Sequence, residues 1–367
     1  MIRLNNLSKI ILTVLVMALL AVWFYTLEQN PRGNGYVITI LERSAIYAIV
    51  AVAMNLMNGF TGLFSLGQAG FMAIGAYIVG VLTIPVAARP NVYYISGIAP
   101  WLANVEVHYL IALLIGGLLA AAIAALIGVL ILKLRSDYLA IATLGFAEII
   151  RAVIASPQMD TITNGSYGLK KILRFDTIFT PFILAGICIF LMVLILRSSY
   201  GRAFLAIRED EIAAEAMGIN LFRHKELSFV ISSFFTGVAG GLLAMFMGSI
   251  DSGTFRVTLT YDILLIVVLG GMGSVSGSVL ASFLVTGGRE FLRFFDEPLA
   301  IAGVSVPLFR PGFRMVIFSV LLMIVVLFYR KGIMGDREFS WDAAAGLLNR
   351  LLPKRTEARG QGGSHDK

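Results

Sequence analysis

The sequence predicts an all-α protein, a polytopic membrane bundle of about eight to ten transmembrane helices with glycine-rich breaks. Two observations carry this prediction. Hydrophobic residues make up 58% of the 367 residues and charged residues only 14%, whereas soluble domains carry roughly a quarter charged residues. Apolar runs of about the length that a spanning helix needs also recur along most of the chain. The chain is therefore predicted to be an integral membrane protein.

The apolar runs succeed one another from the N-terminus. Run 10–27 follows Arg3 and Lys9 and is long for the core of a signal peptide, so we expect a retained helix with its N-terminus inside. The further expected spans are 37–57, 66–86, 108–132, 138–154, 182–196, 227–247 and 313–329. The last span ends at Arg330 and Lys331, which favour the inner side of a membrane.

Run 259–286 is apolar but is interrupted by the stretch GGMGSVSG. If the N-terminus is inside, the alternation of spans leaves the chain outside after 227–247. The last span, 313–329, ends inside and must therefore start outside. The interrupted run must therefore enter and leave from the same side, as two short segments that turn at the glycines. We expect a membrane domain over 1–335 and a cytoplasmic tail over 336–367 whose end is disordered.

A long polar stretch, 197–226, lies between two of the apolar runs and carries several Lys and Arg residues, which indicates a cytoplasmic loop. Asp210 can cap a short helix, Glu211 falls in its first turn, and Gly218 can end it. Apolar residues four apart give this helix a small stripe on which another protein could dock. The alternative is a solvated connection with no partner.

Two glycine-rich breaks, 58–70 and 270–278, interrupt apolar hairpins in the two halves of the chain. Broken helices in corresponding places are typical of a transport path. The alternative is close helix packing through small residues. The candidate path residues are Gly59, Thr61, Gly62, Ser65, Gly67, Gln68 and Gly70 in the first break, and Gly270, Gly271, Gly273, Ser274, Ser276 and Gly277 in the second.

Glu148 and Arg151 are three residues apart in one expected helix. Ionisable residues inside a membrane are functional candidates, but an acid and a base at this spacing can also satisfy each other. The pair is therefore a structural or a functional feature.

The composition excludes several classes of protein. Cys188 is the only cysteine, the three histidines are far apart, and no catalytic cluster, Walker A loop or dinucleotide fingerprint is present. We expect no enzyme, no metal site, no cofactor and no nucleic-acid partner. Any energy source other than an ion gradient must come from a partner. An ion-coupled secondary transporter of small polar solutes is the alternative to a partner-driven transporter.

Five segments, 55–77, 138–151, 163–169, 206–220 and 269–280, together resemble the LivM-like permease subunits of branched-chain amino-acid ABC importers. They occur in the order that the family shows and span most of the chain. Within 206–220, two alanines separated by three residues from a glycine resemble the EAA loop of ABC permeases, although Ile212 stands where an acidic residue is usual. The coupling residues implied by this resemblance are Asp210, Glu211, Ala213, Ala214, Glu215 and Gly218.

The resemblance implies a non-enzymatic permease domain over 1–335, whose loop 197–226 couples it to an ATPase. It implies a heterodimer with a second related permease, two subunits that bind the ATP, and an extracytoplasmic substrate-binding protein. The location implied is a bacterial or archaeal inner membrane, with multiple passes and both termini cytoplasmic. The substrates implied are leucine, isoleucine and valine, or similar small amino acids and amides.

Overall fold

The computed structural model describes residues 6–134, 136–296, 300–301, 304–305, 313–328, 332–335 and 337–339. The chain divides into two units, Phe24–Glu338 and a second made of Met1–Trp23 and Phe339–Lys367. The expected tail lies almost wholly outside the described residues, and so does the expected disorder of its end. The packing described below belongs to unit Phe24–Glu338.

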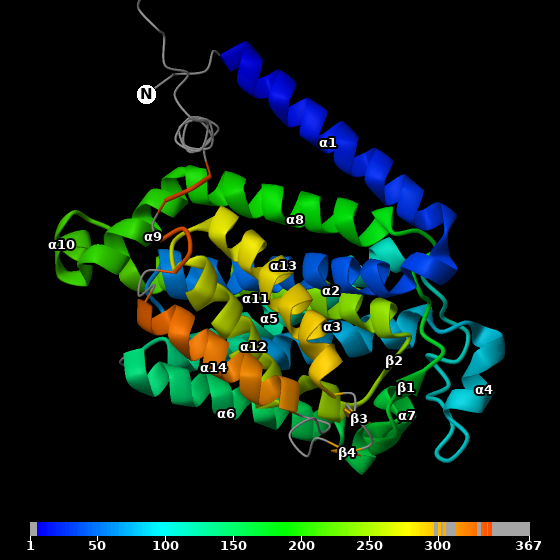
Figure 1. The fold of residues 1–367 in the computed structure, drawn as a ribbon. Coiled ribbons are helices and arrows are strands. Elements are labelled where there is room, and N and C mark those ends of the chain that lie inside the picture. Colours follow the sequence, from blue (N-terminus) through cyan, green and yellow to red (C-terminus); the bar gives the residue numbers. More distant parts are fainter. Residues whose placement is uncertain are drawn as a thin grey trace, which may run out of the picture. The chain divides into compact units, whose positions relative to one another are not determined.

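Every apolar run that the sequence marks as a span is helical (Figure 1). The long helices are α1 (Asn6–Gln29), α2 (Pro31–Asn55), α3 (Gln68–Thr83), α5 (Tyr109–Ile131), α6 (Ser136–Ile154), α8 (Phe179–Arg197), α11 (Leu221–Met247), α12 (Val257–Gly270), α13 (Val275–Phe291) and α14 (Phe313–Phe328). The interrupted run 259–286 forms α12 and α13 with a turn between them, so the predicted break is confirmed.

Shorter elements join these helices. A π-helical turn, η1 (Leu56–Phe60), extends α2, and the polar stretch holds α9 (Ser199–Glu209) and α10 (Glu211–Ala216). The remaining short helices are η2 (Val86–Ala88), α4 (Arg89–Val92), η3 (Pro157–Met159), α7 (Asp160–Thr163), η4 (Gly165–Tyr167), η5 (Ser252–Phe255) and η6 (Leu292–Asp296). Two strand pairs are antiparallel, β1 (Leu169–Lys170) with β2 (Ser249–Ile250) and β3 (Ala300–Ile301) with β4 (Val304–Ser305).

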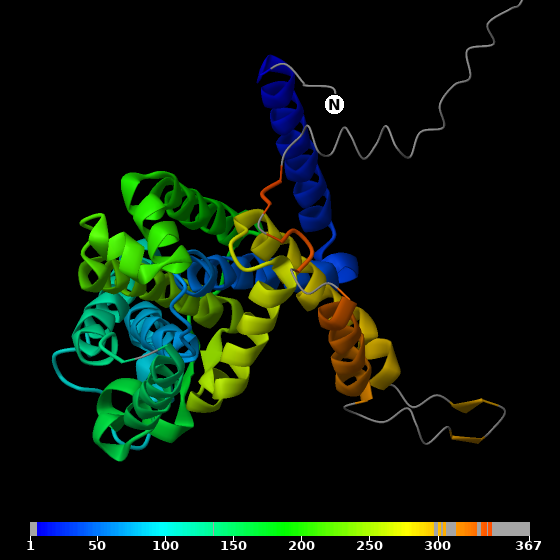
Figure 2. The same ribbon diagram turned by 90° about the vertical axis from the view of Figure 1, so that its left-hand side faces the viewer.

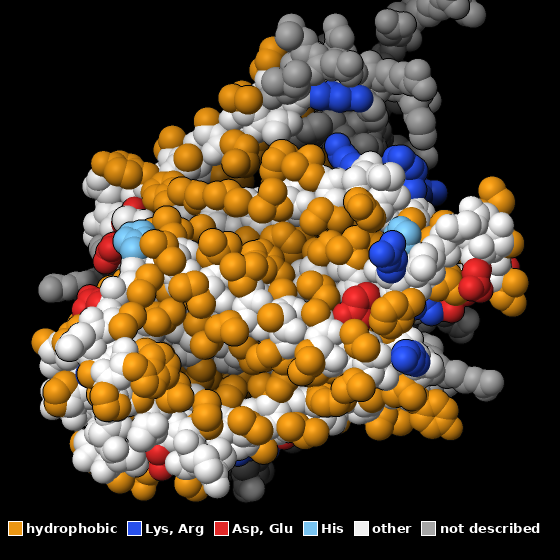
Figure 3. Space-filling model, turned by 180° about the vertical axis from the view of Figure 1, so that it is seen from behind, with side chains coloured by type: hydrophobic (Ala, Val, Ile, Leu, Met, Phe, Trp, Pro, Cys, Tyr) orange, Lys and Arg blue, Asp and Glu red, His pale blue; other side chains and the backbone are white. Residues whose placement is uncertain are grey.

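Among the described residues, five helices are long and apolar enough to cross a membrane, or up to seven if each of two bent helix pairs forms one span. The five are Ile11–Gln29, Gly33–Phe60, Tyr109–Ile131, Phe179–Arg197 and Leu221–Met247. Hydrophobic side chains cover the middle of the face seen in Figure 3, and charged side chains gather toward its two ends. The chain is therefore a multi-pass membrane protein.

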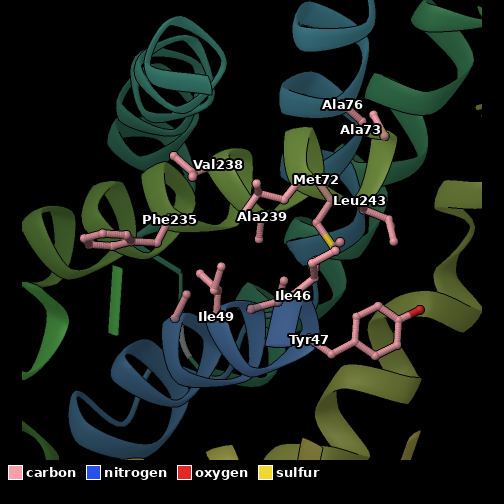
Figure 4. Packing of buried hydrophobic residues seen from close by; sticks show 14 of the residues in the cluster. Ile46, Tyr47, Ile49, Met72, Ala73, Ala76, Phe235, Val238, Ala239 and Leu243 are labelled. Carbon is pink, nitrogen blue, oxygen red and sulfur yellow. The ribbon is translucent and has the colours of Figure 1, made fainter. Parts of the chain in front are cut away.

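The centre of the bundle is formed by α2, α3 and α11 (Figure 4). Ile46 and Ile49 of α2, Met72 of α3, and Ala239 and Leu243 of α11 are all buried there. Lipid is as apolar as these side chains, so close packing, more than removal of apolar surface from water, must hold the helices together.

Glycines allow α3 and α11 to touch through their backbones. A Cβ atom added at Gly75 would lie 1.8 Å from the carbonyl oxygen of Gly237, and one added at Gly240 would lie 2.0 Å from that of Met72. A Cβ atom at Gly237 would also lie 2.6 Å from the Cβ of Ala120 in α5. No side chain fits at these positions, so the glycine spacing sets the distance between the three helices.

The two ends of the bundle differ in construction (Figure 1). One end carries α9 and α10, and the other carries α4, α7 and the β1–β2 pair. At the second end, the buried Arg89 donates hydrogen bonds to the carbonyls of Ile84, Leu102 and Val105. Asn164, which has φ +55°, donates to the carbonyls of Val92 and Gly168 at 3.1 and 2.7 Å. These side-chain hydrogen bonds to backbone carbonyls hold the loops in place at that end.

We expect Gly75→Ala to destabilise the protein, because its Cβ would overlap the Gly237 carbonyl; overpacking of this kind costs roughly 1–3 kcal/mol. Gly145→Ala is the matched control, since nothing lies within 4 Å of the added Cβ. Thermal unfolding can be followed by reaction of a thiol dye with the buried Cys188. Equal melting temperatures for the two variants would contradict the backbone contact between α3 and α11.

Candidate functional site

Residues 199–220 form a compact projection, here called the coupling knob, whose α10 extends furthest from the bundle (Figure 1). Asp210 caps α10 as its position predicts: its Oδ1 accepts hydrogen bonds from the backbone N–H groups of Ile212 and Ala213 at 2.9 and 3.1 Å. The negative carboxylates of Asp210 and Glu211 lie at the positive end of the helix dipole. Local sequence therefore determines where α10 begins.

Gly218 ends α10 with a left-handed turn. Its φ is +85°, its N–H donates to the carbonyl of Glu215 at 2.9 Å, and the N–H of Ile219 donates to that of Ala214 at 3.1 Å. This pair of hydrogen bonds is the Schellman motif, which glycine favours because it has no Cβ. Asn220 then caps α11 by accepting from the N–H of Arg223 at 3.0 Å.

The predicted apolar stripe of α10 is exposed. The side chains of Ile212 and Met217 are 82% and 83% exposed, and Ala213 and Ala216 are exposed between them. Ala214 alone among the residues of α10 is buried, against the rest of the knob. The knob thus presents a small apolar surface that nothing else in the described part of the chain covers. Its role in coupling stays a prediction.

The coupling knob is attached directly to the first glycine-rich break. Phe204 and Ile207 of α9 are buried, and a Cβ atom added at Gly62 would lie 3.3 Å from the Cα of Arg208. A salt bridge of 2.7 Å between Lys225 Nζ and Glu211 Oε2 also ties α10 to α11. One short helix, α9, therefore connects α10 to the first break.

The first break is largely buried and is held by neutral hydrogen bonds. Asn58 and Ser65 bond reciprocally, from Asn58 Nδ2 to the Ser65 carbonyl and from the Ser65 N–H to Asn58 Oδ1, both at 3.2 Å. The hydroxyl of Thr61 lies 2.7 Å from that of Ser228 in α11. The irregular backbone between η1 and α3 thus has partners inside the protein, as it must at membrane depth.

Gln68, the first residue of α3, is buried at the centre of a polar chain. Its Oε1 accepts from the hydroxyl of Thr236 at 2.6 Å, and its Nε2 donates to Ser232 Oγ at 3.4 Å. Ser232 in turn donates to the carbonyl of Ala53 at 2.6 Å. This chain links α2, α3 and α11 through a residue that the sequence marked only as a path candidate.

The second break turns through two glycines with positive φ, Gly271 at +113° and Gly273 at +103°. The side chain of Asn55, at the end of α2, holds this turn. Its Nδ2 donates to the Ser274 carbonyl and to Ser278 Oγ at 2.9 and 2.8 Å, and its Oδ1 accepts from the N–H of Gly273 at 2.9 Å. Asn55 was not among the residues predicted for the path, although an amide at the end of an apolar run was the available signal.

The two breaks meet. A Cβ atom added at Gly59 would lie 2.7 Å from the backbone nitrogen of Gly273. Gly62 is exposed and Gly273 and Ser276 are half-buried, while the other path candidates are buried in this conformation. The structure therefore joins the two predicted clusters into one contact. That they border a transport path stays a prediction.

The segment after α14 packs on the second break. The N–H groups of Ile333 and Met334 donate to the carbonyls of Leu269 and Gly270 at 2.8 and 3.2 Å. The carboxylate of Glu338 accepts from the N–H groups of Val275 and Ser276 at 2.7 and 3.0 Å and so caps α13. Nothing in the local sequence pairs Glu338 with a helix that starts 63 residues earlier.

Glu148 and Arg151 form the ion pair that their spacing allows, with 2.7 Å between Glu148 Oε2 and Arg151 Nε. Both side chains are about one-third exposed, at 34% and 30%. The pair satisfies itself on α6. A transport role for it stays a prediction.

Comparison with known proteins agrees with this architecture. Residues 36–327 match the family described as "Branched-chain amino acid transport system / permease component". The chain is 34% identical to the high-affinity branched-chain amino acid transport system permease protein LivM of Escherichia coli K12 over 73% of this chain and 67% of that protein. The corresponding protein of Salmonella typhimurium is 33% identical over 79% of this chain and 71% of its own length.

More distant relatives include both members of a permease pair. Probable branched-chain amino acid transport permease proteins LivM and LivH of Methanocaldococcus jannaschii are each 24% identical, over 81% and 70% of this chain and 93% and 81% of their own lengths. No solved structure matches the fold. The chain therefore belongs to the family of permease components of branched-chain amino acid transport systems, and it is a membrane-embedded transport permease of the ABC type.

Proposed function

We propose that this chain imports branched-chain amino acids, as one permease subunit of an ATP-driven complex, and is not itself an enzyme. The observation that carries the proposal is the contact between the coupling knob and the first break, at Gly62 and Arg208. An exposed apolar helix joined to an interior break is what a permease moved by an external motor requires. An ion-coupled transporter has no need of it.

The proposed partners follow from the same arrangement. An ATP-binding subunit docks on the exposed stripe of α10, and a second copy of that subunit serves a related permease that pairs with this chain. An extracytoplasmic binding protein delivers the amino acid. The likeness to both LivM and LivH supports a pair of related permeases, and the ATP is bound by the partner subunits.

In the proposed mechanism, the two glycine-rich breaks close the path at the end of the bundle that carries the coupling knob. Asn55 latches α2 to the turn between α12 and α13 with three neutral hydrogen bonds of 2.8–2.9 Å. Each such bond contributes only about 0.5–1.5 kcal/mol to stability, so the latch can open and re-form. Docking of the ATPase would shift α10 and α9, and the Gly62 contact would pass that shift to the first break.

We expect both termini to lie in the cytoplasm, so reporter fusions at Arg3 and Gly335 should both give an inside signal. A fusion at Ala103 should give an outside signal, because Ala103 lies in the connection after α4, and α4 is at the end of the bundle opposite the coupling knob (Figure 1). An outside signal at Gly335 would overturn the parity of the spans.

Ala213→Glu and Gly218→Val should abolish ATP-driven leucine uptake and weaken association with the ATPase. The first places a charge in the exposed apolar stripe, and the second puts a β-branched residue at φ +85°, where side chains cost roughly 1–2 kcal/mol. Glu209→Gln, at an exposed position outside the stripe, is the control. Uptake assays in proteoliposomes with co-purification of the ATPase measure both effects. Full uptake by both variants, or uptake that follows an ion gradient without ATP, would refute the proposal.

Asn55→Leu should cause leucine to leak without ATP. The substitution removes the latch and leaves the N–H of Gly273 unsatisfied, at a cost of about 1–3 kcal/mol. Asn91→Leu, at an exposed position at the other end of the bundle, is the control. Efflux of labelled leucine from preloaded proteoliposomes gives the measurement. A tight Asn55→Leu transporter would argue that the breaks do not form a gate.

A further inference from the structure

A cavity of about 500 Å³ opens between α2, α12 and α13 and is not part of the contacts described above. Its volume falls within the range of about 300–1,000 Å³ that is typical of small-molecule sites. It is lined by α2 residues of the range 35–47 and α13 residues near 285–290, at the ends of both helices away from the glycine-rich breaks. The cavity and the breaks are therefore separate parts of the same three helices.

Charged side chains line this cavity although it lies among apolar helices. Arg289 of α13 holds Asp262 of α12 in a two-pronged ion pair, from Nη1 to Oδ2 at 2.7 Å and from Nη2 to Oδ1 at 2.5 Å. The guanidinium of Arg289 also lies 5.0 Å from the ring of Phe318 in the adjacent α14 (Figure 2). Ionisable groups in membrane segments are costly and mark substrate pathways by default.

Two buried polar atoms at the cavity have no hydrogen-bond partner in the described part of the chain. The two atoms are Thr286 Oγ1 and Arg289 Nε. Thr286 is only 8% exposed. Buried polar groups are normally satisfied, so these two exceptions indicate a missing polar ligand. Beside them, the exposed Arg43 forms no ion pair among the described residues, and its guanidinium lies 5.5 Å from the centre of the Tyr47 ring.

Part of the wall is aliphatic, and the remainder beyond the groups named above is formed by Gly35, Tyr36, Thr39, Tyr47, Glu290 and Arg293. Ile40 of α2, Ile266 of α12 and Val285 of α13 line the same cavity as the charged groups. A ligand that matches all of these groups carries an anion, a cation and a short branched apolar tail. A zwitterionic aliphatic amino acid has this combination within one small molecule.

We propose that this cavity is a transient binding site for an aliphatic amino acid on its way through the permease, which deepens the proposed function and rests on it. Arg43 and the hydroxyl of Thr286 hold the α-carboxylate. Asp262 holds the α-ammonium, because a carboxylate has about four lone-pair sites and Arg289 occupies only two of them. Ile40, Ile266 and Val285 surround the aliphatic side chain. Arg289 is a positioning residue that keeps the Asp262 carboxylate in place.

The first test measures transport by the assembled complex in proteoliposomes. Arg43→Gln and Thr286→Val should each raise the KM for leucine roughly tenfold or more and change kcat little, because both remove hydrogen bonds to the carboxylate. The matched controls are Arg256→Gln, at the start of α12 outside the cavity, and Thr83→Val, a buried threonine of α3. Leucinamide, which has no carboxylate, should be transported equally poorly by the wild type and by Arg43→Gln.

The second test measures binding without turnover. Thr39 is exposed and lines the cavity. In a Cys188→Ser background, a cysteine that replaces Thr39 should react with a polar thiol reagent, and leucine should slow this reaction. A cysteine at Tyr261, which is exposed on α12 outside the cavity, should show no protection. Leucinamide should protect Thr39→Cys less than leucine does.

The outcomes separate this inference from the proposed function. If the wild-type complex imports leucine while Arg43→Gln and Thr286→Val keep their KM and leucine gives no protection at Thr39→Cys, the cavity is not on the path and the importer stands. If the wild-type complex imports no amino acid, the proposed function fails first. Should Arg43→Gln fail to assemble, the near-isosteric Thr286→Val and the protection assay still decide.

Discussion

The amide of Asn55 is the interaction on which the interior of this permease depends. It lies at the point where α2 gives way to irregular backbone, and it reaches residues 218 and 219 positions further along the chain. One neutral side chain thereby satisfies a donor and an acceptor of the turn between α12 and α13. Neutral partners suit this place, because a buried charge would need a counter-charge and would hold the contact too strongly to reverse.

The glycine contacts explain why the latch forms at a defined distance. At Gly75, Gly237 and Gly240 the helices α3, α5 and α11 approach until their backbones meet, so their spacing cannot drift. The hydrogen bonds of Asn55, and those that run through Gln68 and Ser232, therefore form between helices at a fixed distance. The two breaks have irregular backbone, and the coupling knob contacts the first of them at Gly62.

Polar groups inside the bundle fall into two kinds with different consequences. The side chains of Asn55, Thr61 and Gln68 have partners within the protein, so they stabilise the observed arrangement of helices. In the described part of the chain, the buried Thr286 hydroxyl has no hydrogen bond and the exposed Arg43 forms no ion pair, at a cavity whose wall is partly aliphatic. The first kind suits a gate that opens under an external force, and the second suits a site that a passing solute satisfies for a short time.

The sequence by itself determined several features that depend on near neighbours along the chain. The apolar runs located the helices, Asp210 and Gly218 located the two ends of α10, and the spacing of Glu148 and Arg151 predicted their ion pair, because caps, turns and such pairs are formed by residues within a few positions of one another. Only the tertiary structure decided which distant groups meet. The contact of Gly59 with Gly273, the reach of Asn55 and Glu338, and the pairing of Asp262 with Arg289 across two helices depend on how helices pack, and a single sequence carries no local pattern that specifies it.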